Sequence, residues 1–213
     1  TIYDNEAHTP LVWTHLIPAT IEGRALHNVQ NAMFAAALAY NMNISLEDIR
    51  QGLRTFDSTF FQAPGRMNIY DEHPFRVMLD YAHNPAAVKA ICDVADRFDV
   101  DGRRIVVLAA PGDRRDQDIR DIAGIAAGHF DHYICRRDDN PRGRGPDEVP
   151  VMLKDRLLEG GVSGDAIEVV PDEQEATLHA LEMAEPGDFV LVLGDNVKRS
   201  WKQIIYFNSG AHG

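Results

Sequence analysis

Four short segments of the sequence concentrate charged side chains that could bind a nucleotide and an amino acid. They are residues 80–85, 111–116, 136–142 and 194–199, and each also contains Gly or Pro. Carboxylates can accept hydrogen bonds from ribose hydroxyls or a substrate ammonium, and guanidinium groups can hold a carboxylate or phosphate with two bonds. A site with both kinds of group suits an amino acid and a nucleotide together. The alternative is a set of surface ion pairs, each stabilising the fold by about 0–1 kcal/mol.

Each polar segment directly follows an apolar run with the length of a strand. Strands are expected at residues 67–70, 76–81, 104–110, 132–135, 167–170 and 189–193, and helices at residues 86–98, 117–128, 147–159, 173–184 and in a last short stretch ending near residue 207. This alternation predicts an α/β fold, a Rossmann-like and mostly parallel sheet with helices on both faces. Because ligands bind at the carboxyl ends of parallel strands, the four segments should share one edge.

The beginning of the chain has a different pattern, which we interpret as part of a separate domain. Residues 1–22 indicate strands and turns, and residues 25–40 form an alanine-rich helical pattern. Ser45 has the position of an N-cap for a second, short helix. The turn signal Pro64-Gly65 marks the boundary. We therefore expect a first domain at residues 1–63, a second at residues 64–207 and a disordered tail at residues 208–213.

The composition is ordinary for a folded protein and disfavours nucleic-acid and membrane binding. The 213 residues are 45% hydrophobic and carry a net charge of −12, which is unsuited to a phosphate backbone. No apolar run approaches the roughly 20 residues that span a bilayer and no signal peptide is visible, so a cytoplasmic location is expected. Cys92 and Cys135 lie in apolar segments and are interpreted as buried free thiols rather than a disulfide. The nine histidines show no paired ligand spacing, and no metal site is predicted. Homo-oligomerisation is compatible with the sequence.

Three motifs in a fixed order resemble the Mur ligase superfamily. The first is His27-Asn28-Val29-Gln30-Asn31, which opens the alanine-rich helix, the second is Pro64-Gly65-Arg66, and the third is Asp80-Tyr81-Ala82-His83-Asn84-Pro85. The resemblance covers residues 17–206. Within the superfamily, residues 110–116 make the chain most similar to the C-terminal ligase region of the cyanophycin synthetase family. The resemblance implies an ATP-dependent acid–amino-acid ligase that uses ATP and Mg²⁺.

The resemblance also implies which residues bind ATP. Asn28 and Asn31 match asparagines near the adenine, and Arg66 matches an arginine that reaches the nucleotide. Asp80 matches the aspartate that bonds the ribose, and His83 and Asn84 match the residues that flank the nucleotide. Two local alternatives remain open: Asn28 could only cap the helix that follows it, and His83 could make only a local bond.

The amino-acid substrate is implied to bind at residues 110–116 and 139–142. Asp139-Asn140-Pro141-Arg142 is similar to the motif with which the diamino-acid-adding Mur ligase holds its incoming amino acid. The substrate residues implied by this resemblance are Asp113, Arg114, Asp139, Asn140 and Arg142. The incoming amino acid would be arginine, and the partner would be a carboxylate-bearing peptide, a poly-aspartate backbone. The alternative is that Asp139 and Arg142 pair only with one another.

Two departures from the family pattern limit what is expected of the chain alone. The phosphate-binding loop GxxxxGKS/T is absent, so residues 1–63 are expected to be the end of a central ATPase domain whose P-loop lies upstream of Thr1. No catalytic residue is therefore assigned. The last strand is followed by Gly194-Asp195-Asn196, where the diamino-acid-adding ligase has Gly-Lys-Gly-His-Glu. The rival interpretations are another Mur-type ligase, for a cell-wall peptide or folylpolyglutamate, and a non-catalytic binding module. A nicotinamide-binding domain is disfavoured, because no GxGxxG follows a strand.

Overall fold

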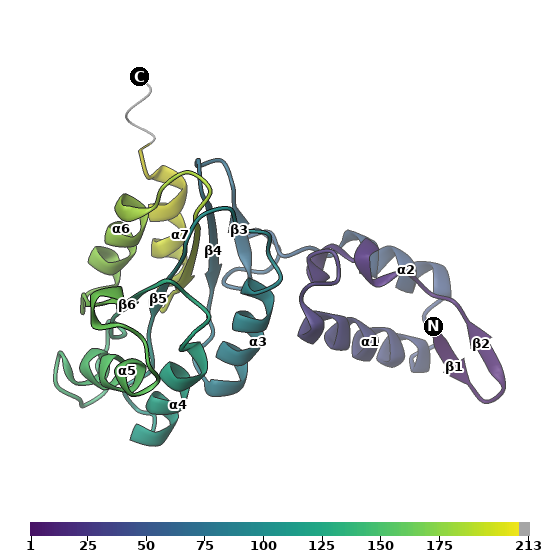
Figure 1. Cartoon of the computed structure of the whole chain (residues 1–213). Helices are drawn as coiled ribbons and strands as arrows, with labels where there is room; N and C mark the ends of the chain where they lie inside the picture. The colour runs from purple at the N-terminus through teal and green to yellow at the C-terminus, as the bar shows by residue number, and fades with distance from the viewer. Residues whose placement is uncertain (209–213) are drawn as a thin grey trace. The chain divides into compact units, whose positions relative to one another are not determined.

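The computed structural model describes residues 1–208, and the chain separates into two compact units (Figure 1). The first unit is Thr1–Ala63, and the second begins at Pro64. Residues 209–213, within the tail expected to be disordered, lie outside the described residues. In residues 1–208, no helix combines the length and the apolar character that a membrane crossing requires.

The first unit consists of a small hairpin, two short 3-10 turns and two helices. Its elements are β1 (Ile2–Asp4) and β2 (Ala7–Thr9), which pair antiparallel, then α1 (Leu26–Asn41) and α2 (Leu46–Thr55). Ser45 caps α2 as predicted, because its hydroxyl accepts a 3.1 Å bond from the Asp48 backbone N–H. Asn28 does not cap α1, so that alternative is wrong. The helix already begins at Leu26, and the Asn28 amide donates instead to the Ala19 carbonyl at 2.7 Å.

The second unit contains a six-stranded sheet of the order β3-β4-β8-β5-β6-β7. Its strands are β3 (Asn68–Tyr70), β4 (Arg76–Asp80), β5 (Arg104–Leu108), β6 (His132–Cys135), β7 (Ile167–Val169) and β8 (Phe189–Leu193). Only the edge strand β3 pairs antiparallel, and the other five strands are parallel. The mostly parallel sheet predicted from the alternating pattern is confirmed. The strand that comes last in the sequence, β8, lies between β4 and β5.

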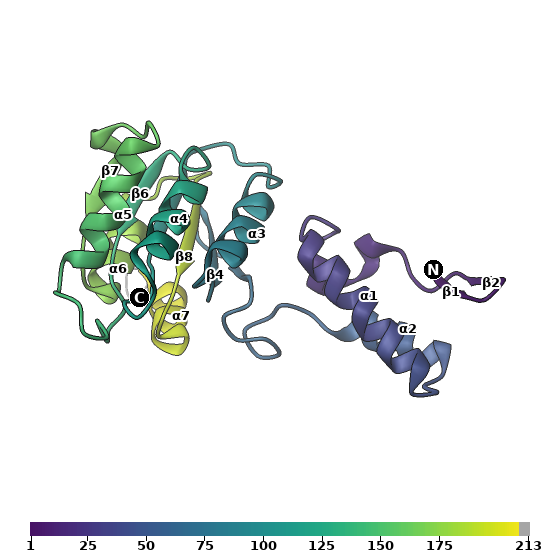
Figure 2. The same cartoon turned by 90° about the horizontal axis from the view of Figure 1, so that it is seen from below.

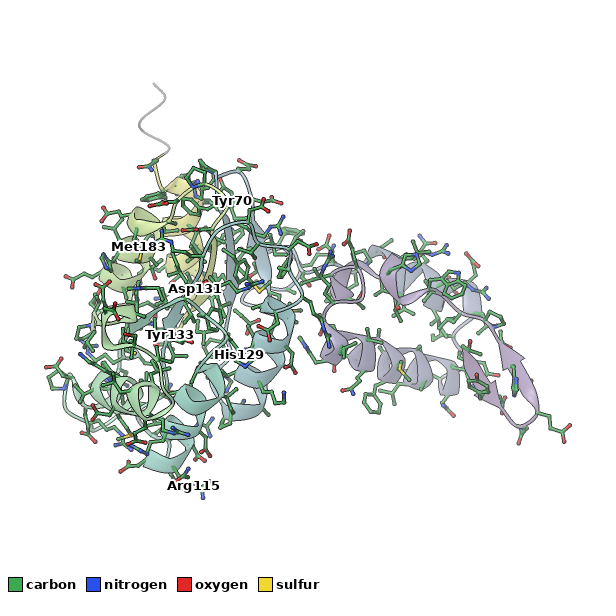
Figure 3. The ribbon with its side chains drawn as sticks, in the orientation of Figure 1. Tyr70, Arg115, His129, Asp131, Tyr133 and Met183 are labelled. Atoms are coloured by element: carbon green, nitrogen blue, oxygen red, sulfur yellow. The ribbon has the colours of Figure 1, made fainter. Side chains whose placement is uncertain are left out.

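Helices cover both faces of this sheet, as predicted. One layer is formed by α3 (Pro85–Ala95), α4 (Asp116–Ala126) and α5 (Glu148–Glu159), and the other by α6 (Glu173–Met183) and α7 (Val197–Tyr206), with the strands between them (Figure 2). The strands are apolar on both sides because both sides are buried. The Tyr133 hydroxyl on β6 is one of the polar groups in this core, and it donates to the Ala126 carbonyl at the end of α4 (Figure 3).

The two cysteines confirm the prediction made for them. Cys92 on α3 and Cys135 on β6 are both buried and both free. Some predicted boundaries were too long. The helix α3 ends at Ala95 rather than Phe98. The strand β5 ends at Leu108 rather than Ala110, because its partner strand β6 ends at Cys135.

Candidate functional site

The carboxyl ends of β4, β8, β5 and β6 meet at one edge of the sheet and bring the four polar segments together, as expected. Asp80 pairs with Leu193, and Leu108 pairs with Cys135, so these strands end at the same level. A shallow pocket opens between the strand ends. Its lining comes from all four segments and comprises Tyr81, Ala82, His83, Ala109, Ala110, Pro111, Arg136, Asp138, Leu193, Gly194 and Asp195.

Asp80, the last residue of β4, stabilises the turn before β3 through a side-chain hydrogen bond. Its carboxylate is buried and accepts a 2.8 Å bond from the Met67 backbone N–H. Burial raises the pKa of Asp80 to about 6, although the Met67 bond and the Arg66 guanidinium oppose the rise. In this turn Gly65 has a φ of +72°, and a Cβ there would lie 2.8 Å from Val197. Because the Asp80 carboxylate already accepts a hydrogen bond from Met67, its bond to a ribose hydroxyl stays a prediction.

The neighbouring residues of the same segment are held by local bonds. The Nδ1 atom of His83 lies 2.9 Å from the Tyr81 carbonyl, so the local bond weighed as an alternative is present. The Nε2 atom of His83 has no partner among the described residues. Asn84 caps α3 by accepting from the Ala87 N–H at 2.9 Å, and Pro85 occupies the first helical position. Arg66 is exposed.

Asn28 and Asn31 belong to the first unit, and the other proposed nucleotide residues belong to the second. The Asn31 amide donates to the Asn28 side-chain oxygen at 3.0 Å. The two asparagines therefore form a pair one helical turn apart on α1. The asparagine pair and the other proposed nucleotide residues belong to different units, so their common role in binding the nucleotide stays a prediction.

The two segments expected to bind the amino acid contact each other closely. Arg142 forms an ion pair with Asp113 at 2.9 Å, and this guanidinium lowers the pKa of the Asp113 carboxyl. Asn140 accepts a 2.9 Å bond from the Arg142 backbone N–H. A side chain at Gly112 would collide with the Pro141 carbonyl oxygen, so this approach requires glycine.

Asp139 is bound by a residue that follows the last strand. The Nη1 and Nη2 atoms of Arg199 lie 2.7 and 2.8 Å from the two oxygens of Asp139, and this pair lowers the pKa of the Asp139 carboxyl. The alternative in which Asp139 and Arg142 pair only with one another is therefore wrong. Arg114, the remaining predicted residue, is exposed, and its neighbour Arg115 points away from this unit at the start of α4 (Figure 3).

Arg144 is a positioning residue that was not predicted from its sequence context. Its guanidinium donates to the Gly112 and Arg114 carbonyls at 2.7 and 2.8 Å and forms ion pairs with Asp116 and Glu148. One side chain thus connects residues 112–116 to the loop after β6. No local pattern distinguishes Arg144 from the other loop arginines, because its partners Gly112, Arg114 and Asp116 lie about 30 residues away in the sequence.

A buried ion pair beneath the pocket is the second feature that the site prediction missed. Arg136 and Glu173 are both almost fully buried, and Nη1 lies 3.1 Å from Oε2. Arg136 also donates to the Leu193 carbonyl, and Glu173 accepts from the Asp195 and Asn196 N–H groups and from the Ser200 hydroxyl. This network fixes the ends of β6 and β8 against the start of α6. An acidic residue in the first turn of a helix is common, so the sequence contained no signal for it.

Comparison with known proteins finds similarity along most of the chain. Residues 65–196 match the family described as Mur ligase, glutamate ligase domain. A cyanophycin synthetase from Trichormus variabilis is 37% identical over 90% of this chain and 22% of its own length. A UDP-N-acetylmuramoyl-L-alanyl-D-glutamate–2,6-diaminopimelate ligase from Corynebacterium efficiens is 34% identical over 84% of this chain and 33% of its own length.

One solved structure adds a similarity of fold. The bifunctional folylpolyglutamate synthase/dihydrofolate synthase of Yersinia pestis, complexed with AMPPNP and a Mn ion, has a TM-score of 0.55 and 26% identity, and it covers 76% of this chain and 34% of that protein. The chain thus spans between about a fifth and a third of the lengths of these proteins.

Proposed function

Because this chain belongs to the Mur ligase family, we propose that it is the C-terminal part of an ATP-dependent ligase that forms amide bonds. In this proposal the parent enzyme is a cyanophycin synthetase, which adds arginine to the side-chain carboxylates of a poly-aspartate backbone. The observation that carries the proposal is the similarity to a cyanophycin synthetase over 90% of the chain. The pocket lined by residues of both charges supports it, because both substrates of such a ligase are charged.

The proposed reaction has two steps. An oxygen of the acceptor carboxylate attacks the γ-phosphorus of ATP, which forms an acyl phosphate and releases ADP. The amino group of arginine then attacks the acyl carbon, phosphate leaves, and the nitrogen loses a proton. A free carboxylate resists attack by an amine, and phosphorylation supplies the leaving group. The protein contributes mainly position and charge neutralisation to a phosphoryl transfer.

Within the second unit, Arg66 and His83 are the proposed direct contacts of the nucleotide. Arg66 is exposed, and His83 lines the pocket with Nε2 unpartnered in the described residues. The side-chain oxygens of Asp80 and Asn84 accept hydrogen bonds from the Met67 and Ala87 backbone N–H groups. We propose that these two residues contribute to nucleotide binding by holding the backbone of residues 80–85 in its conformation. Asn28 and Asn31 are proposed as adenine contacts from the family resemblance alone.

Magnesium would accompany ATP in this reaction. Among residues 1–208, no group of three or more His, Cys, Asp or Glu side chains is arranged to hold a metal ion. The loop GxxxxGKS/T is also absent from the 213 residues. We therefore propose that phosphate and magnesium are bound by the part of the parent protein that carries this loop.

In the segments that follow β5 and β6, the proposed contacts of the amino acid's α-carboxylate are Arg142, Asn140 and Arg114. Arginine holds a carboxylate in a bidentate geometry, which fixes the orientation of the substrate amine. Asp113 and Asp139 support this arrangement, because they pair with Arg142 and Arg199 and keep these two guanidinium groups in place.

The first unit, Thr1–Ala63, is proposed to be the end of the central ATPase domain. Its helix α1 buries only Ala36 among its sixteen residues. Large apolar side chains are exposed along it, at Leu26, Met33, Phe34 and Leu38. Apolar surface of this extent is typical of a face that other parts of a protein cover. Hydrogen exchange on α1 should be slower in the longer parent protein than in this chain, and equal rates would contradict the assignment.

Phosphate release by the parent protein tests the proposed function. Release from ATP should rise when arginine and a poly-aspartate primer are both present, and omission of either should abolish the rise. The 213-residue chain alone should release no phosphate, because it lacks the P-loop. A rise with a cell-wall peptide and a diamino acid, or with folate and glutamate, would instead identify another Mur-type ligase. No release with any pair would favour a non-catalytic binding module.

A further inference from the structure

We propose that Asp138 and Asp195 form a cation-selecting pair in this pocket and bind the guanidinium group of the incoming amino acid. The inference rests on the proposed function only for the identity of this cation as the substrate of a ligase. Neither residue belongs to the set implied by the family resemblance.

Asp138 is a buried carboxylate with spare hydrogen-bonding capacity. It lines the pocket, and its side chain is only 8% exposed. Its Oδ1 atom lies 3.3 Å from Nη1 of Arg136, longer than the 2.7–2.9 Å of a strong charge-assisted bond. No other group in residues 1–208 donates to this carboxylate. A carboxylate offers about four acceptor positions, so Asp138 can accept from a ligand.

Arg136 does not satisfy Asp138, because Arg136 is shared with a better partner. Glu173 lies closer to the same Nη1 atom, at 3.1 Å, and three further donors saturate its oxygens. The two other arginines nearby have carboxylates of their own, since Arg199 holds Asp139 and Arg142 holds Asp113. Among these three arginines, Asp138 is therefore left only with a weak interaction with Arg136.

Asp195 provides a second carboxylate in the lining of the same pocket. It follows Gly194 at the carboxyl end of β8, lines the pocket and is half-buried. Its carboxylate has no partner among the described residues, although its backbone N–H is bound by Glu173. Burial raises the pKa of Asp138, Arg136 opposes the rise, and the charge of Asp195 adds to it. A cation between the two carboxylates would remove this repulsion.

The lining of the pocket favours a guanidinium group over a metal ion. Ala82, Ala109, Ala110 and Leu193 supply apolar lining beside the two carboxylates. A planar guanidinium can donate to two carboxylates at once. Mg²⁺ requires near-octahedral oxygen coordination, and the guanidinium of Arg136 lies beside one of the two candidate ligands.

Titration of the ¹⁵N-labelled 213-residue chain with arginine tests the pair directly, because NMR shifts report even millimolar binding. Arginine should shift the amides of Ala110, Gly194 and Asp195. Citrulline, which has the same length and no charge, should bind about tenfold more weakly or worse. Equal binding of arginine and citrulline, no shifts with arginine at millimolar concentrations, or the same shifts with Mg²⁺ alone would overturn the proposal.

Matched substitutions test whether Asp138 and Asp195 are the carboxylates that bind arginine. Asp138→Asn and Asp195→Asn should each weaken arginine binding by about tenfold and reduce the preference over citrulline. Asp101→Asn removes the same charge at the opposite edge of the sheet and should leave binding unchanged. Asp195 has no side-chain bond in the described residues, so Asp195→Asn keeps the test valid if Asp138→Asn unfolds. Unchanged affinity of the Asp195→Asn variant for arginine would overturn the proposal that the two carboxylates bind the guanidinium together.

The parent enzyme separates this inference from the proposed function. Arginine binding by the chain without arginine-dependent phosphate release by the parent would refute the ligase and leave the cation pair standing. Phosphate release that citrulline supports as well as arginine would refute the cation pair and leave the ligase standing.

Discussion

Glu173 and Arg136 form an ion pair with a 3.1 Å separation between Oε2 and Nη1, although both side chains are at most 1% exposed. Removing two charges from water is unfavourable unless their remaining hydrogen-bonding groups are satisfied. Glu173 meets this condition through the Asp195 and Asn196 N–H groups and the Ser200 hydroxyl. The pair therefore determines where the loop after β8 lies relative to the end of β6.

Glu173→Ala should lower the free energy of unfolding by about 3–5 kcal/mol, because it leaves the Arg136 charge buried without its best partner. Urea unfolding followed by circular dichroism measures this loss. Glu175→Ala, at an exposed position of the same helix, should change the stability by no more than about 0.5 kcal/mol. Similar losses in the two variants would mean that the network does not stabilise the fold.

Asp80→Asn should stabilise the protein at pH 8 and have little effect at pH 4. Burial raises the pKa of Asp80 to about 6, above its ordinary value, so the folded state favours the protonated form. This contribution to stability is fully present below pH 4 and is lost as the pH rises through 6. A rise of two pKa units corresponds to about 3 kcal/mol, and asparagine avoids the penalty while still accepting from Met67.

Urea unfolding of both proteins across this pH range provides the measurement for Asp80. The difference between wild type and Asp80→Asn should grow between pH 4 and pH 7. A difference that stays constant with pH would show that the carboxyl titrates normally in the folded protein.

Gly112→Ala should separate the two loops that meet beside the pocket. The added methyl group would collide with the Pro141 carbonyl, and the loop would have to move away. We expect a loss of about 1–3 kcal/mol in unfolding free energy and faster hydrogen exchange at the Arg144 amide, which donates to Pro141. Gly145→Ala, in the same region, adds a methyl group at ordinary contact distance and serves as the control. Equal exchange in both variants would contradict the close approach.

Both cysteines should resist a thiol reagent in the folded protein. Burial raises the pKa of the Cys92 and Cys135 thiols to about 12, so the reactive thiolate is scarce at pH 8. Reaction with a disulfide reagent should be about a hundredfold slower than in denaturant, where two thiols per chain should react. Fast reaction of either cysteine without denaturant would show that its segment opens readily.

Much of the second unit was predictable because its signals are local. The apolar strands follow from residues within a few positions of one another, as does the Ser45 cap in the first unit. The shared carboxyl edge then follows from the parallel alternation alone. The end of β5 was predicted less accurately, because it depends on where its partner strand β6 ends.

The sequence by itself determined the alternation of strands and helices, the polar strand ends and the glycine-dependent turns. Only the tertiary structure decided which charges pair. The last strand, β8, enters the sheet between β4 and β5, and this order brings Arg199 to Asp139, 60 residues away, and Glu173 to Arg136. Local patterns do not encode that insertion, because an apolar strand has the same appearance at every position in a sheet. The carboxylates left over from this pairing, Asp138 and Asp195, could therefore be recognised only once the strands were in place.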